Sequence, residues 1–284
     1  MRLRLRVTLH RSLFCCILST TLCLLSGRAS AEAADRPDRV PDVAAPAPEA
    51  TPSPVPIATI RLIINIPARE LRVIDQGQLT TTYPVAVGQP KYRSIVMSEL
   101  IQRIEWNPVW YPPKSEWAKD AVETPPGPNN PLGVVKLPIS RGILIHGTNN
   151  ASSVGRSVSH GCFRMRNPDA AALAWLLQSR FSDKTDPNLP ATYAKHRRRT
   201  FVVALFEAVP VDIVYEPIEV RGDTLYLYPD VYGRVAHWEE AVRAQLTAAG
   251  IDVSAVPSTA FRQLRVRLRK GKVVIPIAEL LTVS

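Results

Sequence analysis

Residues 157–167 read SVSHGCFRMRN, and the run ILIHGT stands at residues 143–148. ILIH is an apolar run that predicts a strand ending on His146, where the imidazole ring can face a cleft. Twelve residues separate this histidine from Ser159, and Cys162 follows three positions later. A thiol becomes a nucleophile as its thiolate, and a nearby imidazole can accept the proton. The two stretches therefore predict a cysteine–histidine pair on a β scaffold.

Two histidines are candidates for the proton acceptor. Side chains two positions apart on a strand share a face, so His160 lies close to Cys162 but is poorly placed for an in-line hydrogen bond. His146 arrives from another strand and can meet the sulfur directly. Gly161 lets the backbone turn tightly and leaves amide groups for a developing oxyanion.

Three other interpretations use the same residues. Two histidines and a cysteine are also zinc ligands, but the sequence contains no C-x-x-C or H-E-x-x-H spacing. A papain-like protease places its cysteine before its histidine, whereas His146 precedes Cys162 here. A free cysteine also often behaves as a small core residue, so the cysteine count alone leaves a buried thiol open. We expect no metal and no organic cofactor.

The first 31 residues have the layout of a secretory signal. Four arginines up to Arg11 precede an apolar run over residues 13–25, and small residues follow at 29–31. The run is shorter than the ~20 residues that cross a membrane. We expect cleavage after Ala31 and a periplasmic protein, with an uncleaved membrane anchor as the alternative. Three of the four cysteines lie in this segment, so cleavage leaves Cys162 without an intramolecular partner.

The charge of the chain argues against nucleic acid as a partner. The 284 residues carry a formal net charge of +10, and removal of residues 1–31 takes away five arginines and no acid, which leaves +5. An exported, mildly basic chain is a poor candidate for nucleic-acid binding. We interpret the run KHRRR at residues 195–199 as a solvated loop.

Composition divides the chain into four parts. Residues 32–57 are rich in proline, alanine and acids without an apolar period, which is typical of an extended spacer. The expected parts are a signal peptide over 1–31, a linker over 32–57, a folded domain over 58–217 and a C-terminal hairpin and helix appendage over 218–284.

Most of the chain after the linker is predicted to be β-structure. Strands are expected at 60–66, 70–75, 79–87, 133–137, 142–146, 200–206, 211–220 and 221–228. The proline-rich stretch 107–131 predicts a long functional loop. A helix is expected from Asn167, with this residue as its cap and Pro168 at the first helical position. Another helix is expected at about 235–249, and residues 264–277 are predicted to form a basic hairpin turning at Gly271.

Several motifs resemble one family. IHGT and SHGCFRM, preceded in order by YPVAVG (83–88), NPVWYPP (107–113) and NNPLG (129–133), closely resemble the L,D-transpeptidase catalytic domain of bacterial cell-wall enzymes. The resemblance runs from about residue 60 to 215. It implies a mainly β fold, an L,D-transpeptidase-like β-sandwich with a short helical element, here followed by a small α+β C-terminal appendage.

The resemblance also implies roles for individual residues. Cys162 is expected to be the nucleophile and His146 the proton acceptor and donor, with the carbonyl of Gly147 orienting the imidazole. Ser159 and His160 would shape the pocket.

The remaining implied roles concern charge and binding. The amides around Gly161 and Cys162 would form the oxyanion hole. Arg164 and Thr148 would bind substrate, Arg164 near a substrate carboxylate; for Arg164 a structural salt bridge is the alternative.

The implied reaction is an acyl transfer on peptidoglycan stem peptides. Cys162 attacks the carbonyl of the third stem residue and expels the terminal D-alanine. The acceptor is a diaminopimelate amine, which gives a 3→3 crosslink, a lysine of an envelope lipoprotein, or water, which makes a carboxypeptidase. An amidase that trims crosslinks and a non-catalytic wall-binding scaffold are the alternatives.

Two stretches depart from the family pattern: residues 94–95, and the loop SDKTDPNLPATYAKHRRR over residues 182–199, which replaces the usual closing strand of the domain. Ser94 and Ile95 stand where many members have Thr-Pro, so we expect the fold to survive and the substrate-side loop to differ. The role of residues 218–284 is left open between contact with the anionic wall polymer and simple packing.

Overall fold

The computed structural model describes residues 59–140 and 142–282. The expected signal peptide and linker lie outside the described residues. Within these ranges, every helix is too short or too polar to cross a membrane.

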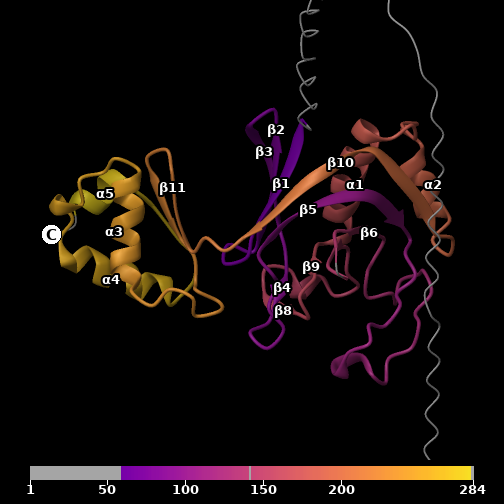
Figure 1. Ribbon diagram of the computed structural model, residues 1–284, viewed down its shortest axis with the longest axis horizontal. Helices are drawn as coiled ribbons and strands as arrows, with labels where there is room; N and C mark the ends of the chain where they lie inside the picture. The colour runs from indigo at the N-terminus through magenta and orange to yellow at the C-terminus, as the bar shows by residue number, and fades with distance from the viewer. Residues whose placement is uncertain (1–58, 141, 283–284) are drawn as a thin grey trace, which may run out of the picture. The chain divides into compact units, whose positions relative to one another are not determined.

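An eight-stranded sheet forms the larger part of the structure (Figure 1). Its strands run in the order β3-β2-β1-β10-β5-β6-β7-β9. They are β1 (Ile60–Asn65), β2 (Glu70–Asp75), β3 (Gln78–Pro84), β5 (Met97–Trp106), β6 (Val135–Pro138), β7 (Leu144–His146), β9 (Phe163–Arg164) and β10 (Phe201–Val214). A separate parallel pair joins β4 (Val87–Gly88) to β8 (Ser157–Ser159). The prediction of a mainly β fold is confirmed.

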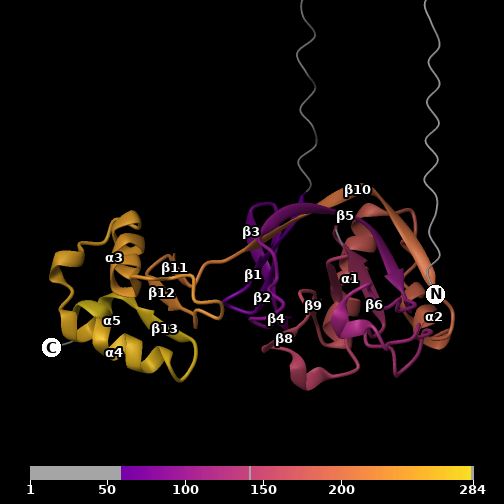
Figure 2. The same ribbon diagram turned by 60° about the horizontal axis from the view of Figure 1, so that its bottom comes forward.

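Strand β10 organises this sheet. It pairs antiparallel with β5 along most of its length, and its last residues also pair parallel with β1, so this late strand lies between two strands from the first half of the domain (Figure 2). Val209, Val211 and Ile213 are buried while the residues between them are only partly buried. This period of two places one face of the strand in the core.

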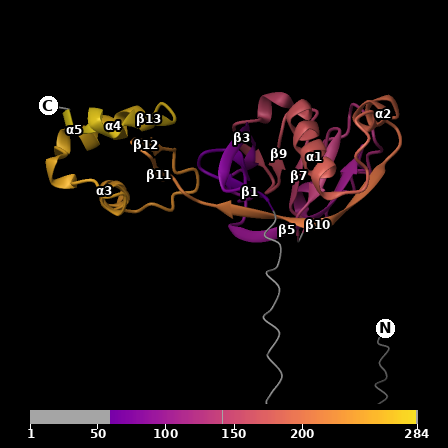
Figure 3. The same ribbon diagram turned by 90° about the horizontal axis from the view of Figure 1, so that it is seen from above.

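Helix α1 (Asn167–Phe181) covers part of the sheet and packs against β6 and β10 (Figure 3). Its buried residues recur at helical spacing: Ala170, Leu173, Ala174, Leu177 and Phe181. The prediction that Asn167 caps this helix is wrong, because the cap is Arg166 and Asn167 is the first helical residue. The Asn167 side chain instead accepts from the backbone N–H groups of Val134 and Thr148, at 3.2 and 3.1 Å.

The loop 107–131 contains only a single 3-10 turn, η1 (Glu116–Ala118). A second such turn, η2 (Ala151–Ser153), follows β7. Helix α2 (Leu189–Lys195) precedes β10, and residues 195–199 after it are exposed.

The C-terminal residues form their own sheet and core. Strands β11 (Ile218–Arg221), β12 (Thr224–Leu227) and β13 (Val273–Pro276) make a three-stranded sheet. Helices α3 (Trp238–Ala248), α4 (Ser258–Leu268) and α5 (Ile277–Thr282), with the turn η3 (Val253–Ala255), complete this part. The second expected helix is thus found as α3.

The predicted hairpin over residues 264–277 is wrong. Its first half is the end of α4, and only β13 is a strand. Phe261, Leu264 and Leu268 recur at helical spacing, with the first two buried and the third packed against the same core, while Val266 is 56% exposed. The alternation of leucine and arginine imitates a strand, but burial follows the 3.6-residue period.

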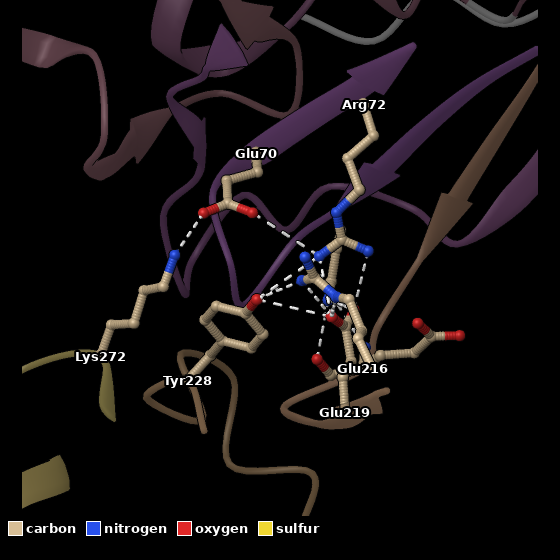
Figure 4. A network of polar contacts seen from close by, with 8 residues as sticks. Glu70, Arg72, Glu216, Glu219, Tyr228 and Lys272 are labelled. Carbon is tan, nitrogen blue, oxygen red and sulfur yellow. Dashed lines mark hydrogen bonds and ion pairs between the residues drawn. The ribbon is translucent and has the colours of Figure 1, made fainter. Parts of the chain in front are cut away.

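The chain returns to the first core after β12. Val231 and Tyr232 pack with the hydrophobic residues of the large sheet, whereas the residues of β11, β12 and α3 pack in a second cluster. Polar contacts also join the large sheet to the C-terminal part of the chain. Arg72 on β2 meets Glu219 on β11, and Lys272 meets Glu70 at 2.7 Å (Figure 4).

Candidate active site

Two short parallel strands bring the predicted histidine and cysteine together. In β7 and β9, Ile145 pairs with Phe163 and His146 pairs with Arg164. Ile145 and Phe163 are fully buried in the core. Because side chains alternate along a strand, His146 and Arg164 face the other side. Cys162, directly before β9, lines the same cavity as both.

This cavity has a volume of about 580 Å³. Its floor is made by His146, Cys162 and Arg164, and aromatic residues of the loop 107–131 form a wall. These aromatic residues are Trp110, Tyr111 and Trp117. Two cations, Lys136 and Arg164, line the cavity, and none of the described residues that line it is acidic. The cavity therefore favours a ligand that carries negative charge.

The surroundings of Cys162 favour the protonated form of its thiol. Burial raises its pKa, and the Leu144 backbone and the Arg164 charge offset only part of this effect. The Sγ atom lies 3.6 Å from the carbonyl oxygen of Gly142, to which the thiol donates rather than to a histidine ring. A base is therefore needed to generate the thiolate.

His146 is 4% exposed and is suited to act as that base. Burial lowers its pKa to about 4, with further lowering from the charges of Arg164 and Lys136. Its Nδ1 lies 2.5 Å from the carbonyl oxygen of Gly147. A carbonyl only accepts, so Nδ1 carries the hydrogen and Nε2 keeps its lone pair. The neutral ring can thus take a proton at Nε2.

The backbone before Cys162 is held in a tight turn by Ser159. The hydroxyl of Ser159 donates to the Cys162 carbonyl at 2.6 Å and accepts from the Gly161 N–H at 3.1 Å. Gly161 has φ of +113°, a region that favours glycine. The Gly161 N–H already donates to the Ser159 hydroxyl. The Cys162 N–H is therefore the amide of this turn that can donate to an oxyanion.

His160 lies between two aromatic rings. Trp117 stacks on it with ring centroids 4.0 Å apart and planes 11° apart, and Tyr92 lies 4.7 Å away on a tilted plane. Burial and the charge of Arg164 lower the His160 pKa. His160 therefore links the aromatic wall to the turn that carries Cys162.

Arg164 has the features of a ligand-binding cation. It lines the cavity beside Cys162, and burial lowers its pKa. Among residues 59–140 and 142–282, no carboxylate forms an ion pair with it. By contrast, Lys136 is paired with Glu105 at 2.9 Å.

Thr148 and Gly147 lie at the edge of the site. Thr148 lines a different hollow, and its hydroxyl accepts from the Asn150 N–H at 3.1 Å. A Cβ atom on Gly147 would lie 2.3 Å from the Asn167 side chain, so only glycine fits there. Asn167 thus fixes the segment that carries the carbonyl partner of His146.

Within the part of the chain that the structure describes, no group of three histidine, cysteine, aspartate or glutamate side chains is placed to hold a metal ion.

Sequence reasoning missed Trp117, Tyr92 and Lys136 as parts of this site. The run NPVWYPP had indicated a functional loop, but nothing in it shows that Trp117 stacks on a histidine 43 positions later. Such contacts depend on tertiary structure, which local patterns do not carry.

Comparison with known proteins identifies the family. A family model described as the L,D-transpeptidase catalytic domain matches residues 59–203, just over half of the chain. The chain belongs to this family.

Individual relatives match over the same region. YkuD of Bacillus licheniformis is 34% identical over 115 residues, which cover 40% of this chain and 58% of the relative. YbiS of Escherichia coli K12, described as a probable L,D-transpeptidase, is 33% identical over 117 residues, 38% of each chain. The chain thus spans less than two thirds of these relatives. A solved structure, L,D-transpeptidase 3 from Mycobacterium tuberculosis, is 15% identical with a TM-score of 0.36 and covers 55% of this chain and 61% of its own.

Proposed function

We propose that this protein is an L,D-transpeptidase of the cell envelope that uses Cys162 as its nucleophile. The observation that carries the proposal is the meeting of Cys162, His146 and the unpaired Arg164 in one cavity without an acidic lining residue. The family membership supports the same reaction class.

The proposed reaction begins with both partners neutral. His146 takes the thiol proton at Nε2, and the sulfur of Cys162 attacks the carbonyl carbon of the third stem-peptide residue. The carbon–nitrogen bond to the terminal D-alanine breaks, and His146 returns the proton to the leaving amine. A thioester to Cys162 remains.

The second half of the reaction repeats these steps with an incoming amine. His146 removes a proton from the amine as it attacks the thioester, and the thiol leaves. A diaminopimelate amine gives a 3→3 crosslink, and a lipoprotein lysine would anchor that protein to the wall. Water as acceptor gives a carboxypeptidase product.

The cavity supports a stem peptide as the donor. Such a peptide carries carboxylates, which Arg164 can bind through its paired N–H groups. Trp110, Tyr111 and Trp117 provide apolar area for the rest of the chain. The signal-like residues 1–31 support a periplasmic location, where this substrate lies.

The proposal is tested with residues 32–284 and a Cys162→Ala variant. Each is incubated with disaccharide tetrapeptides that contain diaminopimelate, and the products are identified by mass. Cysteine-dependent dimers that lack one D-alanine are the expected result. Cysteine-dependent tripeptide alone would identify a carboxypeptidase, and a folded protein without any product would contradict the proposed acyl transfer.

A further inference from the structure

Tyr232 lies beyond residue 203, where the family match ends, yet it is packed into the core of the large sheet. It is 5% exposed, and its ring stacks on Tyr215 with centroids 5.5 Å apart. Its backbone N–H donates to the Tyr215 hydroxyl at 2.8 Å. The position of its phenol is therefore well defined.

The phenol of Tyr232 makes two buried hydrogen bonds. It accepts from the backbone N–H of Ser94 at 2.9 Å and donates to the carbonyl of Gly88 at 2.8 Å. Gly88 is the last residue of β4, and Ser94 lies in the segment that follows this strand. A Cβ atom on Gly88 would approach the Tyr92 carbonyl oxygen to 2.2 Å, so this segment closes tightly on itself.

The hydroxyl of Ser94 continues the connection to the catalytic turn. It accepts from the Gly88 N–H at 2.9 Å and donates to the carbonyl oxygen of Gly161 at 2.8 Å. Ser94 is fully buried. Each of the two hydroxyls therefore accepts one hydrogen bond and donates one, so four hydrogen bonds connect Tyr232 to Gly161 through Gly88 and Ser94.

The carbonyl of Gly161 belongs to the peptide bond that also contains the Cys162 N–H. A trans peptide is planar, and its C=O and N–H point in opposite directions. A fixed carbonyl direction therefore fixes the direction of the Cys162 N–H. Ser159 holds the neighbouring Gly161 N–H and Cys162 carbonyl from the other side.

We propose that Tyr232 is a positioning residue that acts through Ser94 to orient the Gly161–Cys162 peptide, and so the amide that binds the oxyanion during acyl transfer. The inference rests on the proposed function of Cys162. It gives part of the region beyond the matched domain a role in the reaction.

Two reactions of Cys162 separate oxyanion binding from thiol reactivity. Alkylation by iodoacetamide needs the thiolate but forms no oxyanion. Acylation by p-nitrophenyl acetate passes through a tetrahedral oxyanion, transfers the acetyl group to sulfur and releases p-nitrophenolate. The ratio of the two rates therefore reports the oxyanion contribution and does not depend on the natural substrate.

The first variants are Tyr232→Phe and Ser94→Ala. We expect each to lower the ratio of acylation to alkylation about tenfold, less than the ~100-fold or greater loss caused by removing a whole oxyanion donor. With the stem peptide, kcat should fall and KM should stay constant. Ser94→Thr keeps the hydroxyl, so its ratio should be close to that of the wild type. If Tyr232→Phe does not fold, the comparison of Ser94→Ala with Ser94→Thr tests the inference.

Tyr228→Phe is the matched control. Tyr228 is 1% exposed, and its hydroxyl contacts Glu219 (Figure 4). It also accepts from Arg221 at 2.6 Å, so its contacts do not involve Ser94. It should lower thermal stability and leave the ratio unchanged. Equal ratios in wild type, Tyr232→Phe and Ser94→Ala would overturn the inference, as would an equal loss in Tyr228→Phe. Absence of crosslinks with the wild type, together with an altered ratio in the variants, would contradict only the proposed function.

Discussion

Arg72 donates from its two terminal guanidinium nitrogens to the two carboxylate oxygens of Glu219, at 3.0 and 2.9 Å (Figure 4). The side chains are 9% and 8% exposed, and they join β2 to β11. Replacing Arg72 by methionine leaves a buried carboxylate without its main partner. Because Arg221 and Asn65 still contact Glu219, we expect a loss of about 1–3 kcal/mol in the free energy of unfolding, measured by urea denaturation.

An exposed ion pair provides the control for this change. Arg61 pairs with Asp212, and its side chain is 57% exposed. Arg61→Ala should change stability by about 1 kcal/mol or less, because water screens the pair. Equal effects of the two substitutions would show that burial of the Arg72–Glu219 pair adds nothing.

The Arg72–Glu219 pair makes the stability of the protein depend on pH. Burial raises the pKa of Glu219, but the hydrogen bonds and charges of Arg72 and Arg221 outweigh it, and the pKa is lowered. A carboxyl with a lowered folded pKa stabilises the protein above its unfolded pKa of about 4.3, and this stability is lost as pH falls through the folded value. The stability difference between wild type and Glu219→Gln should therefore be larger at pH 7 than at pH 3. A difference that is constant across this range would contradict the assignment.

We expect the pKa of His146 to determine the pH at which kcat/KM falls on the acid side of its pH profile. Since burial lowers this pKa to about 4, the ring is neutral and able to accept a proton at pH 5. We expect kcat/KM for the stem peptide to stay near its plateau down to about pH 5 and to fall below it. An acid limb near 6.5, the ordinary value for histidine, would mean that the ring is solvated during the reaction.

Substrate charge should matter through Arg164. Arg164→Gln is expected to raise KM at least about tenfold for a peptide with a free carboxylate at the third residue, because a charge-assisted pair is lost. The matched substrate carries an amide in place of that carboxylate, and the two enzymes should then differ little. Equal losses with both substrates would assign Arg164 a structural role.

The stack of Trp117 on His160 is expected to stabilise the aromatic wall. Trp117→Ala removes a contact of the kind that contributes about 0.5–1.5 kcal/mol. We expect KM to rise up to about tenfold, with faster alkylation of Cys162 because the cavity is less covered. Tyr111→Ala, also in the wall but without a ring partner in the described residues, should change the alkylation rate less.

Local sequence pattern was sufficient to predict that His146 and Cys162 line the same cavity. An apolar run ending on a histidine and a glycine beside the cysteine are local features, and the strands β7 and β9 bring them into one cavity. The contributions of Ser94 and Tyr232 were not predictable, because their hydrogen bonds span 67 and 138 positions. A serine and a tyrosine show no spacing that would connect them.

Strand β5 was also not predicted. Its exposed polar residues alternate unevenly with buried Ile101, Ile104 and Trp106, and the change of register in its pairing with β10 breaks the regular period. The bulge shifts which residues face the core, so a simple period-two pattern does not describe the strand.

The pairing of β1 with β10 sets the order in which the domain can assemble. Leu62 pairs with Val211, so the first strand acquires its second neighbour only after some 150 residues have been synthesised. Until then the meander of β1, β2 and β3 has a bare edge with apolar side chains, which invites association with other chains. A chain that emerges N-terminus first therefore exposes this edge of β1 until β10 is complete.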